Sequence, residues 1–475
     1  MITFLACVSI LVIGYFTYGT YVSKTVGYDD SIQTPAIRLE DGVDYMPMPW
    51  HKVFLIQFLN IAGTGPIFGA ISGALFGPVA FLWITFGCIF AGAVHDLLSG
   101  VISMKHDGTS IPEIVGIYLG KNMKIIMVAF SIVLLVLVGT VFITSPAGLL
   151  TSMTGINKNI WLVLIIIYYI VATVLPVDKV IGKLYPIFGS ALLLMAAGLF
   201  GAMIIGQFNG SMQMAELSLT NMHPGGLSIF PFLFTTIACG AISGFHATQS
   251  PMMARCINKE SETRRVFFGS MIVEGIVALI WCAVTIAFFG DSLAIQAAGT
   301  PAEIVNTISK ALLGPAGAIL AVLGVVACPI TSGDTAFRSA RLTIADAFKI
   351  KQDGLKNRFM LALPLFAVGV ALTQINFDII WRYFAWSNQT LAMIFLWTGA
   401  AYLLVNKKNY WIAVIPAIFM SYVSVAYILQ APEGFKLNAT FSNATGVVVA
   451  IVFFIAFMMR VKKEKNEAEK FEKAS

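Results

Sequence analysis

The stretch NIAGTGPIFGAISGALFGP, residues 60–78, crowds glycine and proline into an apolar segment that would otherwise form one continuous helix. Gly63, Gly65 and Pro66 are nearly adjacent, and glycine and proline at this density favour unwinding of the helix. Close packing through small residues is the alternative, because the glycines of GPIFGAISG also repeat every four residues. The proline favours a broken helix at this position.

A second stretch, TTIACGAISGFHATQSP at residues 235–251, contains the pentapeptide GAISG that also occurs at 69–73. It lies five apolar segments further along, so a chain that crosses the membrane at each segment passes through it in the opposite direction. Two broken helices in mirrored halves indicate an inverted repeat, and they point to the binding site of a transporter. Because unwound backbone cannot face lipid, it must line a sheltered polar cavity.

Composition makes lipid the surroundings of most of this chain. Of its 475 residues, 58% are hydrophobic and 11% charged, less than half the charged share that is usual in soluble domains. Recurring apolar runs of about 18–25 residues match a hydrocarbon core roughly 30 Å thick and predict about 13 transmembrane helices. The net charge of +6 is modest and its basic residues lie between the runs, so no nucleic-acid partner is expected.

The basic residues predict the orientation. If the N-terminus is outside, all but four of the 30 lysines and arginines lie in or next to cytoplasmic segments. The four exceptions are Lys158, Lys310, Arg382 and Lys436. Because basic residues resist translocation, we expect a multi-pass protein of a cytoplasmic (inner) membrane with its N-terminus outside and its C-terminus in the cytoplasm.

The predicted fold is an all-α integral membrane protein with an inverted repeat of five plus five helices, LeuT/APC-like, and additional peripheral helices. The six cysteines show no CxxC spacing, so neither a disulfide nor a metal site is expected, and no cofactor is implied. The predicted units are a peripheral transmembrane helix and cytoplasmic loop at 1–45, a first repeat at 46–206, an extracytoplasmic loop at 207–226, a second repeat at 227–405, two peripheral transmembrane helices at 406–460 and a charged cytoplasmic tail at 461–475.

Four titratable side chains fall inside the apolar spans: His95, Asp96, His246 and Glu274. A charged group near the bilayer centre costs about 2.5–3.5 kcal/mol, so it persists where it faces a cavity or a partner. We predict that these residues carry the coupled proton. The alternative for each is a satisfied hydrogen bond between helices. Because His95 and Asp96 are adjacent on a helix, their side chains should diverge by about 100° and serve different neighbours.

Other polar or flexible residues near the two breaks are candidate substrate ligands, through backbone N–H groups, carbonyls or side chains. Two roles are open for Arg382: it binds the carboxylate of the substrate, or its side chain extends to the membrane interface. Asp334 and Arg338 are a candidate cytoplasmic gate, although their spacing also fits a simple i, i+4 ion pair. The substrate-binding candidates are Gly63, Thr64, Gly65, Gly240, Ser243, Gly244, Gln249, Arg382, Asn388 and Gln389.

Several further stretches resemble motifs of one known family, and they occur along the chain in the same order as in that family. They are TPAIRLEDGVDYMP (34–47), AGAVHDLLSG (91–100), GDTAFRSARLTIAD (333–346) and YFAWSNQTLA (383–392). Together with the two broken segments they resemble the carbon-starvation protein A (CstA) family. The resemblance implies a bacterial inner-membrane transporter with an inverted-repeat fold, which takes up peptides or, with protons, pyruvate. His95 stands where a glutamine is familiar in that family, so the resemblance leaves the substrate open.

These observations predict a secondary active transporter that works by alternating access. Its expected task is proton-coupled uptake of small peptides or pyruvate-like carboxylates during carbon starvation, and its expected partners are membrane lipid, that substrate and the proton. The alternative is a channel for a small solute or ion, which would also use broken helices and polar linings. A membrane-embedded enzyme is disfavoured, because the sequence has no HExxH motif, nucleophile elbow or nucleotide loop.

Overall fold

The computed structural model describes residues 1–42, 44–173, 178–350, 352 and 354–474. Within these residues all regular secondary structure is helical, apart from one isolated bridge between Met48 and Ile257. Ten helices are long and apolar enough to cross a membrane, or eleven if the bent pair Trp50–Ile61 and Gly65–Phe76 counts as one span. The chain is therefore a multi-pass membrane protein. The total of about 13 spans stays a prediction.

The first half of the chain holds α1 (Ile2–Phe16), α2 (Tyr18–Val26), α3 (Pro35–Arg38), α4 (Trp50–Ile61), α5 (Gly65–Gly73), η1 (Ala74–Phe76), α6 (Ala80–Leu82), η2 (Trp83–Gly92), α7 (Ala93–Lys105), α8 (Ile111–Leu119), α9 (Lys121–Thr154), α10 (Lys158–Ala172) and α11 (Asp178–Asn209). The second half holds η3 (Ile229–Leu233), α12 (Phe234–Thr236), α13 (Gly244–Ala254), η4 (Glu260–Glu262), η5 (Arg264–Phe268), α14 (Gly269–Phe289), α15 (Ser292–Ala297), α16 (Pro301–Ala321), η6 (Val322–Ala327), α17 (Cys328–Phe348), α18 (Leu355–Leu372), α19 (Phe377–Val405), α20 (Trp411–Gln430) and α21 (Ala439–Ala474).

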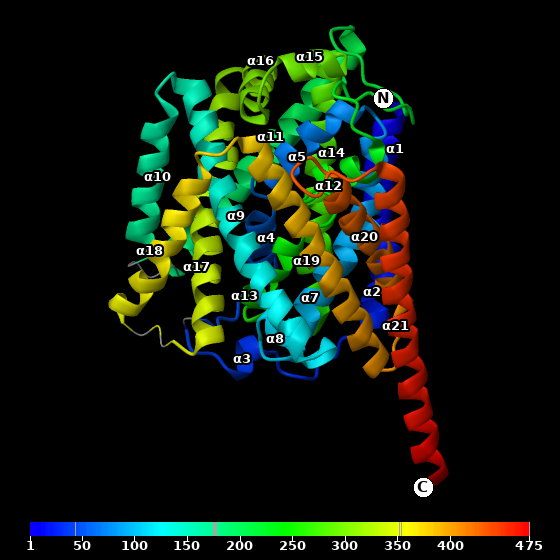
Figure 1. Cartoon of the computed structure of the whole chain (residues 1–475). Helices are drawn as coiled ribbons and strands as arrows, with labels where there is room; N and C mark the ends of the chain where they lie inside the picture. The colour runs from blue at the N-terminus through cyan, green and yellow to red at the C-terminus, as the bar shows by residue number, and fades with distance from the viewer. Residues whose placement is uncertain (43, 174–177, 351, 353, 475) are drawn as a thin grey trace.

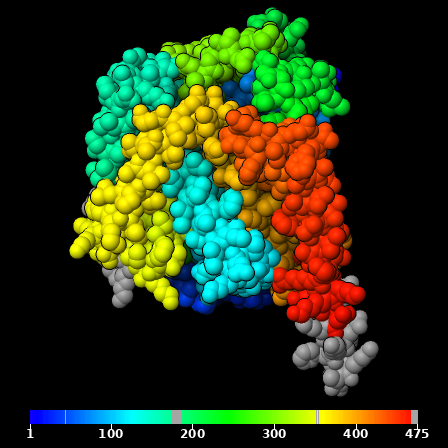
Figure 2. Space-filling view, in the orientation of Figure 1, coloured from blue at the N-terminus to red at the C-terminus, as the bar shows by residue number. Residues whose placement is uncertain are grey.

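The broken segments lie inside the bundle. Figure 1 shows α4 and α13 in its lower part and α5 and α12 in its upper part, so the two segments run in opposite directions. On the face drawn in Figure 2, α8 and α9 (cyan) are exposed between the yellow helices and the red C-terminal helix. The most apolar stretch of α19 is 89% buried, whereas that of α18 is only 22% buried. Helix α19 therefore belongs to the core, and α18 faces the surroundings.

A π-helical stretch, η2, leads into α7. Such wide turns are rare and often occur at functional sites, because they shift the register of the side chains that follow. Its last residue, Gly92, lies against the second broken segment: an added Cβ would come within 2.3 Å of the carbonyl oxygen of Ala241. Only a glycine permits this approach, which brings the start of α7 next to residues 237–243.

The motif at 34–47 lies across the lower end of the bundle, between α2 and α4. The backbone N–H of Met46 donates to Arg255 O at 3.2 Å, and that of Met48 donates to Cys256 O at 3.0 Å. Arg38 pairs with Asp107 at the end of α7. These bonds tie the segment before α4 to the chain that follows α13.

Residues 333–348 contain Asp334 and Arg338, the candidate gate pair. They continue α17 without a break to Phe348. Alanine, leucine and arginine, which recur along this stretch, favour helix. The tail, expected to be a charged helix or a disordered end, is helical to Ala474, and residue 475 lies outside the described residues.

Candidate functional site

The first break separates α4 from α5. The two helices meet at a bend of 49° around residues 62–64. Pro66 explains the interruption: it has no N–H to donate to Ala62, and its ring would clash with the Ala62 carbonyl in a continuous helix. Thr64 Oγ1 is buried there, and no described residue offers it a hydrogen bond. The predicted broken helix is confirmed.

The second break separates α12 from α13, and residues 237–243 between them are not helical. Neighbouring side chains satisfy part of the opened backbone, as buried polar groups require. Trp83 Nε1 donates to Ile237 O at 3.1 Å, and Asn388 Oδ1 accepts from Ser243 Oγ at 3.0 Å and from Phe245 N at 2.7 Å. The second predicted interruption is therefore also confirmed, and Asn388 acts as its cap.

The two breaks touch through their glycines. An added Cβ on Gly65 would lie 2.4 Å from Cys239 Sγ, and one on Gly73 would lie 2.4 Å from Ile237 Cδ1. Helix α4 also packs on α13, and α5 on α12. The unwound backbone of both segments is thus gathered in one place, as a shared cavity lining requires.

We expect Asn388→Ala to lower the stability of the protein by about 1–2 kcal/mol, because the N-terminus of α13 loses its cap and two donors lose their acceptor. Thermal unfolding of the purified protein in detergent measures this loss. Asn406→Ala is the matched control: Asn406 is an exposed asparagine at the other end of α19, and its Nδ2 donates to Tyr402 O at 2.8 Å. Equal shifts for the two variants would contradict the capping role.

The four titratable residues predicted from the sequence form one buried line. Asp96 Oδ1 contacts His95 Nδ1 at 2.8 Å, and Asp96 Oδ2 contacts His246 Nδ1 at 2.9 Å. His246 Nε2 lies 3.4 Å from Glu274 Oε2. All four side chains are fully buried. Three separate helices, α7, α13 and α14, therefore meet through groups that can exchange protons.

One detail of that prediction was wrong. His95 and Asp96 were expected to serve different neighbours, because adjacent side chains on a helix point about 100° apart. In the structure the imidazole and the carboxylate bend toward each other and form a hydrogen bond. A carboxylate has two oxygens that can each accept, so Asp96 also reaches His246 on α13.

Several buried polar atoms near the breaks have no hydrogen-bond partner within the described part of the chain. Besides Thr64 they include Oε1 of Gln249 and Oε1 of Gln389. The sequence analysis missed Gln57 and Asn60, whose side chains carry such atoms on α4. Two amides three residues apart on one helix face, directly before a break, were the available signal. Buried groups of this kind suit a polar ligand or water.

The remaining substrate candidates lie in different surroundings. Gly63 faces the ring of Phe142 on α9, and Gly240 faces Ala278 on α14. Arg382 is instead engaged elsewhere, since its Nε lies 3.1 Å from Oε2 of the buried Glu433 after α20. The structure therefore brings Arg382 to the α20–α21 connection and to neither break.

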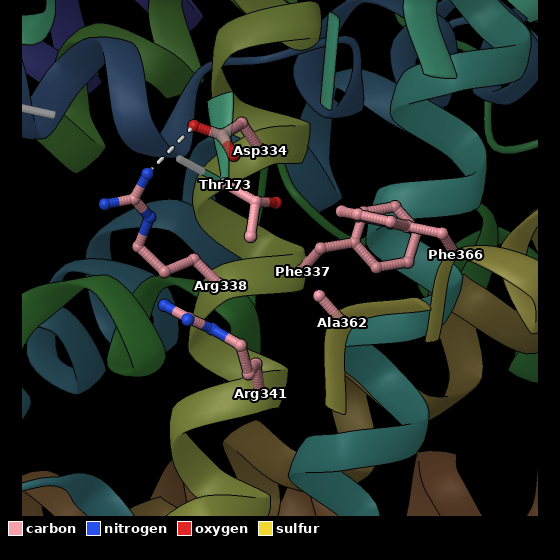
Figure 3. A pocket seen from close by; sticks show the side chains of 7 residues that line it. All are labelled: Thr173, Asp334, Phe337, Arg338, Arg341, Ala362 and Phe366. Atoms are coloured by element: carbon pink, nitrogen blue, oxygen red, sulfur yellow. Dashed lines mark hydrogen bonds and ion pairs between the residues drawn. The ribbon is translucent and has the colours of Figure 1, made fainter. Parts of the chain in front are cut away.

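The candidate gate residues lie at a small pocket between α10, α17 and α18. Figure 3 shows Asp334 and Arg338 facing each other, with Thr173 beside them. The ion pair measures 3.5 Å, and Arg338 NH2 also donates to Ala172 O at 3.3 Å. The i, i+4 pair is thus present. The sequence analysis did not single out Arg341, which is buried at the same pocket.

A metal site has no basis in the described residues, where no three histidine, cysteine, aspartate or glutamate side chains gather in an arrangement that could hold an ion. The six cysteines are all free and buried.

Comparison with known proteins gives one family. The family model described as carbon starvation protein CstA matches residues 1–155 and 144–313. An uncharacterized membrane protein of Haemophilus influenzae is 43% identical, over 62% of this chain and 93% of that protein. The peptide transporter CstA of Bacillus subtilis is 28% identical over 98% and 96%. The pyruvate/proton symporter BtsT of Escherichia coli is 27% identical, over 58% of this chain and 47% of that protein.

Solved structures give the same fold at low sequence identity. A mutant manganese transporter of Eremococcus coleocola has a TM-score of 0.56 at 10% identity and covers 87% of this chain and 94% of its own. MhsT in complex with L-phenylalanine has a TM-score of 0.54 at 15% identity and covers 85% and 97%. The fold is that of the LeuT-like transporters, as the broken segments predicted.

Proposed function

The chain belongs to the carbon starvation protein CstA family, and on that premise we propose that it carries a small carboxylate-bearing nutrient into the cell together with a proton. It is a secondary transporter. Relatives are named for peptides and for pyruvate with protons. Both cargoes present a carboxylate, which suits the N-termini of α5 and α13, where N–H groups and the helix dipole favour negative charge.

In this proposal the cargo sits between the two breaks. Backbone at Gly63, Gly65, Gly240 and Gly244 and side chains at Thr64, Ser243, Gln249, Asn388 and Gln389 would form the site, while Arg382 would act from outside it. About 13 spans would form two inverted repeats, 46–206 and 227–405, with peripheral helices at either end. The protein would lie in a bacterial inner membrane with its N-terminus outside, and Asp334 and Arg338 would gate the cytoplasmic side.

One observation carries the proposal: a buried line of protonatable groups passes through the first turn of α13, directly after the second break. His246 stands two residues after Gly244, where α13 begins. Ionisable groups in a membrane interior are expensive and mark ion or proton pathways. Because α13 also supplies the N-terminus that would receive the cargo, proton and cargo act on the same helix, which is what coupling requires.

The test is uptake into proteoliposomes that contain the purified protein, with labelled pyruvate and labelled dialanine measured side by side. An inward proton gradient of about one pH unit supplies about 1.4 kcal/mol per proton, so a symporter of one proton should accumulate its substrate up to about tenfold. We expect saturable, gradient-dependent accumulation of one of the two. Non-saturating flux would favour a channel. Uptake that is the same with and without the proton gradient would contradict the proposed coupling to protons.

A further inference from the structure

The aspartate at the centre of the buried line determines where the hydrogens of its two histidines lie. Its two oxygens contact the Nδ1 atoms of His95 and His246, at 2.8 and 2.9 Å. Because an ionised carboxylate can only accept hydrogen bonds, both Nδ1 atoms carry hydrogen. A neutral imidazole with hydrogen on Nδ1 presents a bare lone pair at Nε2.

On His246 this lone pair faces a second carboxyl group. Nε2 lies 3.4 Å from Glu274 Oε2, and neither oxygen of Glu274 has a hydrogen-bond partner in the described ranges. As a carboxylate, the fully buried Glu274 would be an unsolvated charge that faces both a lone pair and the charge of Asp96. A proton on Oε2, directed toward Nε2, removes both repulsions.

His95 is placed differently. Its Nε2 is buried without a partner among the described residues, and its ring meets Phe395 edge-on, with centroids 5.4 Å apart. An additional proton on Nε2 would therefore be an unsatisfied donor in apolar surroundings. His95 is a positioning residue: it donates to Asp96 and keeps that carboxylate ionised.

We infer that Glu274, through its contact with His246, holds the one proton that this carrier loads and releases, an inference that rests on the proposed function. Separation of α13 from α14 would open the contact and admit water. The O–H bond of Glu274 then breaks, the proton passes to water, and the carboxylate remains solvated. The thiol of Cys88 also lies against α14, one turn before Glu274, where it donates to Met271 O at 3.2 Å.

The first experiment needs no substrate. Infrared spectra of the purified protein in detergent near neutral pH should contain the C=O band of a protonated carboxylic acid, and Glu274→Gln should remove it. Ser250→Ala is the matched control, because it removes the 2.7 Å hydrogen bond to Ser99 between α13 and α7 without changing a titratable group. A band that is absent from the wild type, or that survives Glu274→Gln, overturns the inference.

The second experiment compares two modes of transport in proteoliposomes with labelled pyruvate and labelled dialanine: accumulation driven by an inward gradient of about one pH unit, and exchange at equal pH. Glu274→Gln should lower the ratio of accumulation to exchange by about tenfold, the full value of that gradient. His95→Leu should also lower it, and His95→Gln should restore it, because glutamine keeps a donor for Asp96.

The outcomes separate the two claims. If the wild type accumulates neither probe under the gradient, the proposed function fails, while the infrared band still decides the protonation of Glu274. If the wild type is driven by the gradient and Glu274→Gln keeps the wild-type ratio, the proton is loaded elsewhere and the inference fails alone.

Discussion

Gly244→Ala is expected to abolish transport and to lower the free energy of unfolding by at least about 1–3 kcal/mol, the range of overpacked cores. An added Cβ would lie 2.4 Å from Asn388 O and 2.6 Å from Ala392 N. Both are backbone atoms of α19, so no side chain can rotate out of the way. Either α13 or α19 must shift, and the contacts of Asn388 with Ser243 and Phe245 shift with them.

Uptake in proteoliposomes and thermal unfolding in detergent measure the two effects. Gly148→Ala is the control, because a Cβ there would meet Ala302 Cβ at 3.6 Å, which is an ordinary contact. We expect its unfolding temperature and uptake to match the wild type. If Gly244→Ala behaves like this control, the close approach of α13 to α19 is not required for function.

The parts of the fold that could be predicted from the sequence are those in which the cost of exposing polar groups to lipid restricts the possible structures. Glycine and proline crowded at residues 63–66 favour an interrupted helix, and an interrupted helix must be sheltered from lipid. Likewise, His246 and Glu274 were found because charge inside an apolar run is expensive and therefore stands out. Both inferences depend on the penalty of burying polar groups, which can be assessed from the sequence alone.

The parts that were missed depend on partners distant in the sequence. Nothing in the sequence near Arg382 indicates that its ion-pair partner is Glu433, because the glutamate lies in a loop beyond the next helix. The carboxylate that His95 contacts is shared with His246, which lies on another helix 150 residues further along, so its position could not be inferred from the local sequence. Gln57 and Asn60 were overlooked because amides carry no charge, so they stand out less in an apolar run.

Asp96 should be the most sensitive residue of the buried line. Asp96→Ala removes the shared partner of two buried imidazoles, and breaking a buried pair in this way costs about 3–5 kcal/mol. Thermal unfolding in detergent should show this loss. Ser99→Ala, on the same helix, gives up two neutral hydrogen bonds, to Asp96 O and to Ser250 Oγ, and should cost about 1–2 kcal/mol. Comparable losses for the two variants would contradict a central role for the carboxylate.

Asp96→Asn separates charge from shape. Its amide has one oxygen to accept from one histidine and an NH2 group that must donate to the other, so one imidazole has to move its hydrogen to Nε2. On His95 that hydrogen has no acceptor, at a cost of about 1–3 kcal/mol. On His246 it points at Glu274 and favours the carboxylate over the acid. In both arrangements the charge of Asp96, which disfavours the carboxylate form of Glu274, is lost. The variant should therefore fold yet lose gradient-driven accumulation in proteoliposomes, and wild-type accumulation would show that the charge of Asp96 is dispensable.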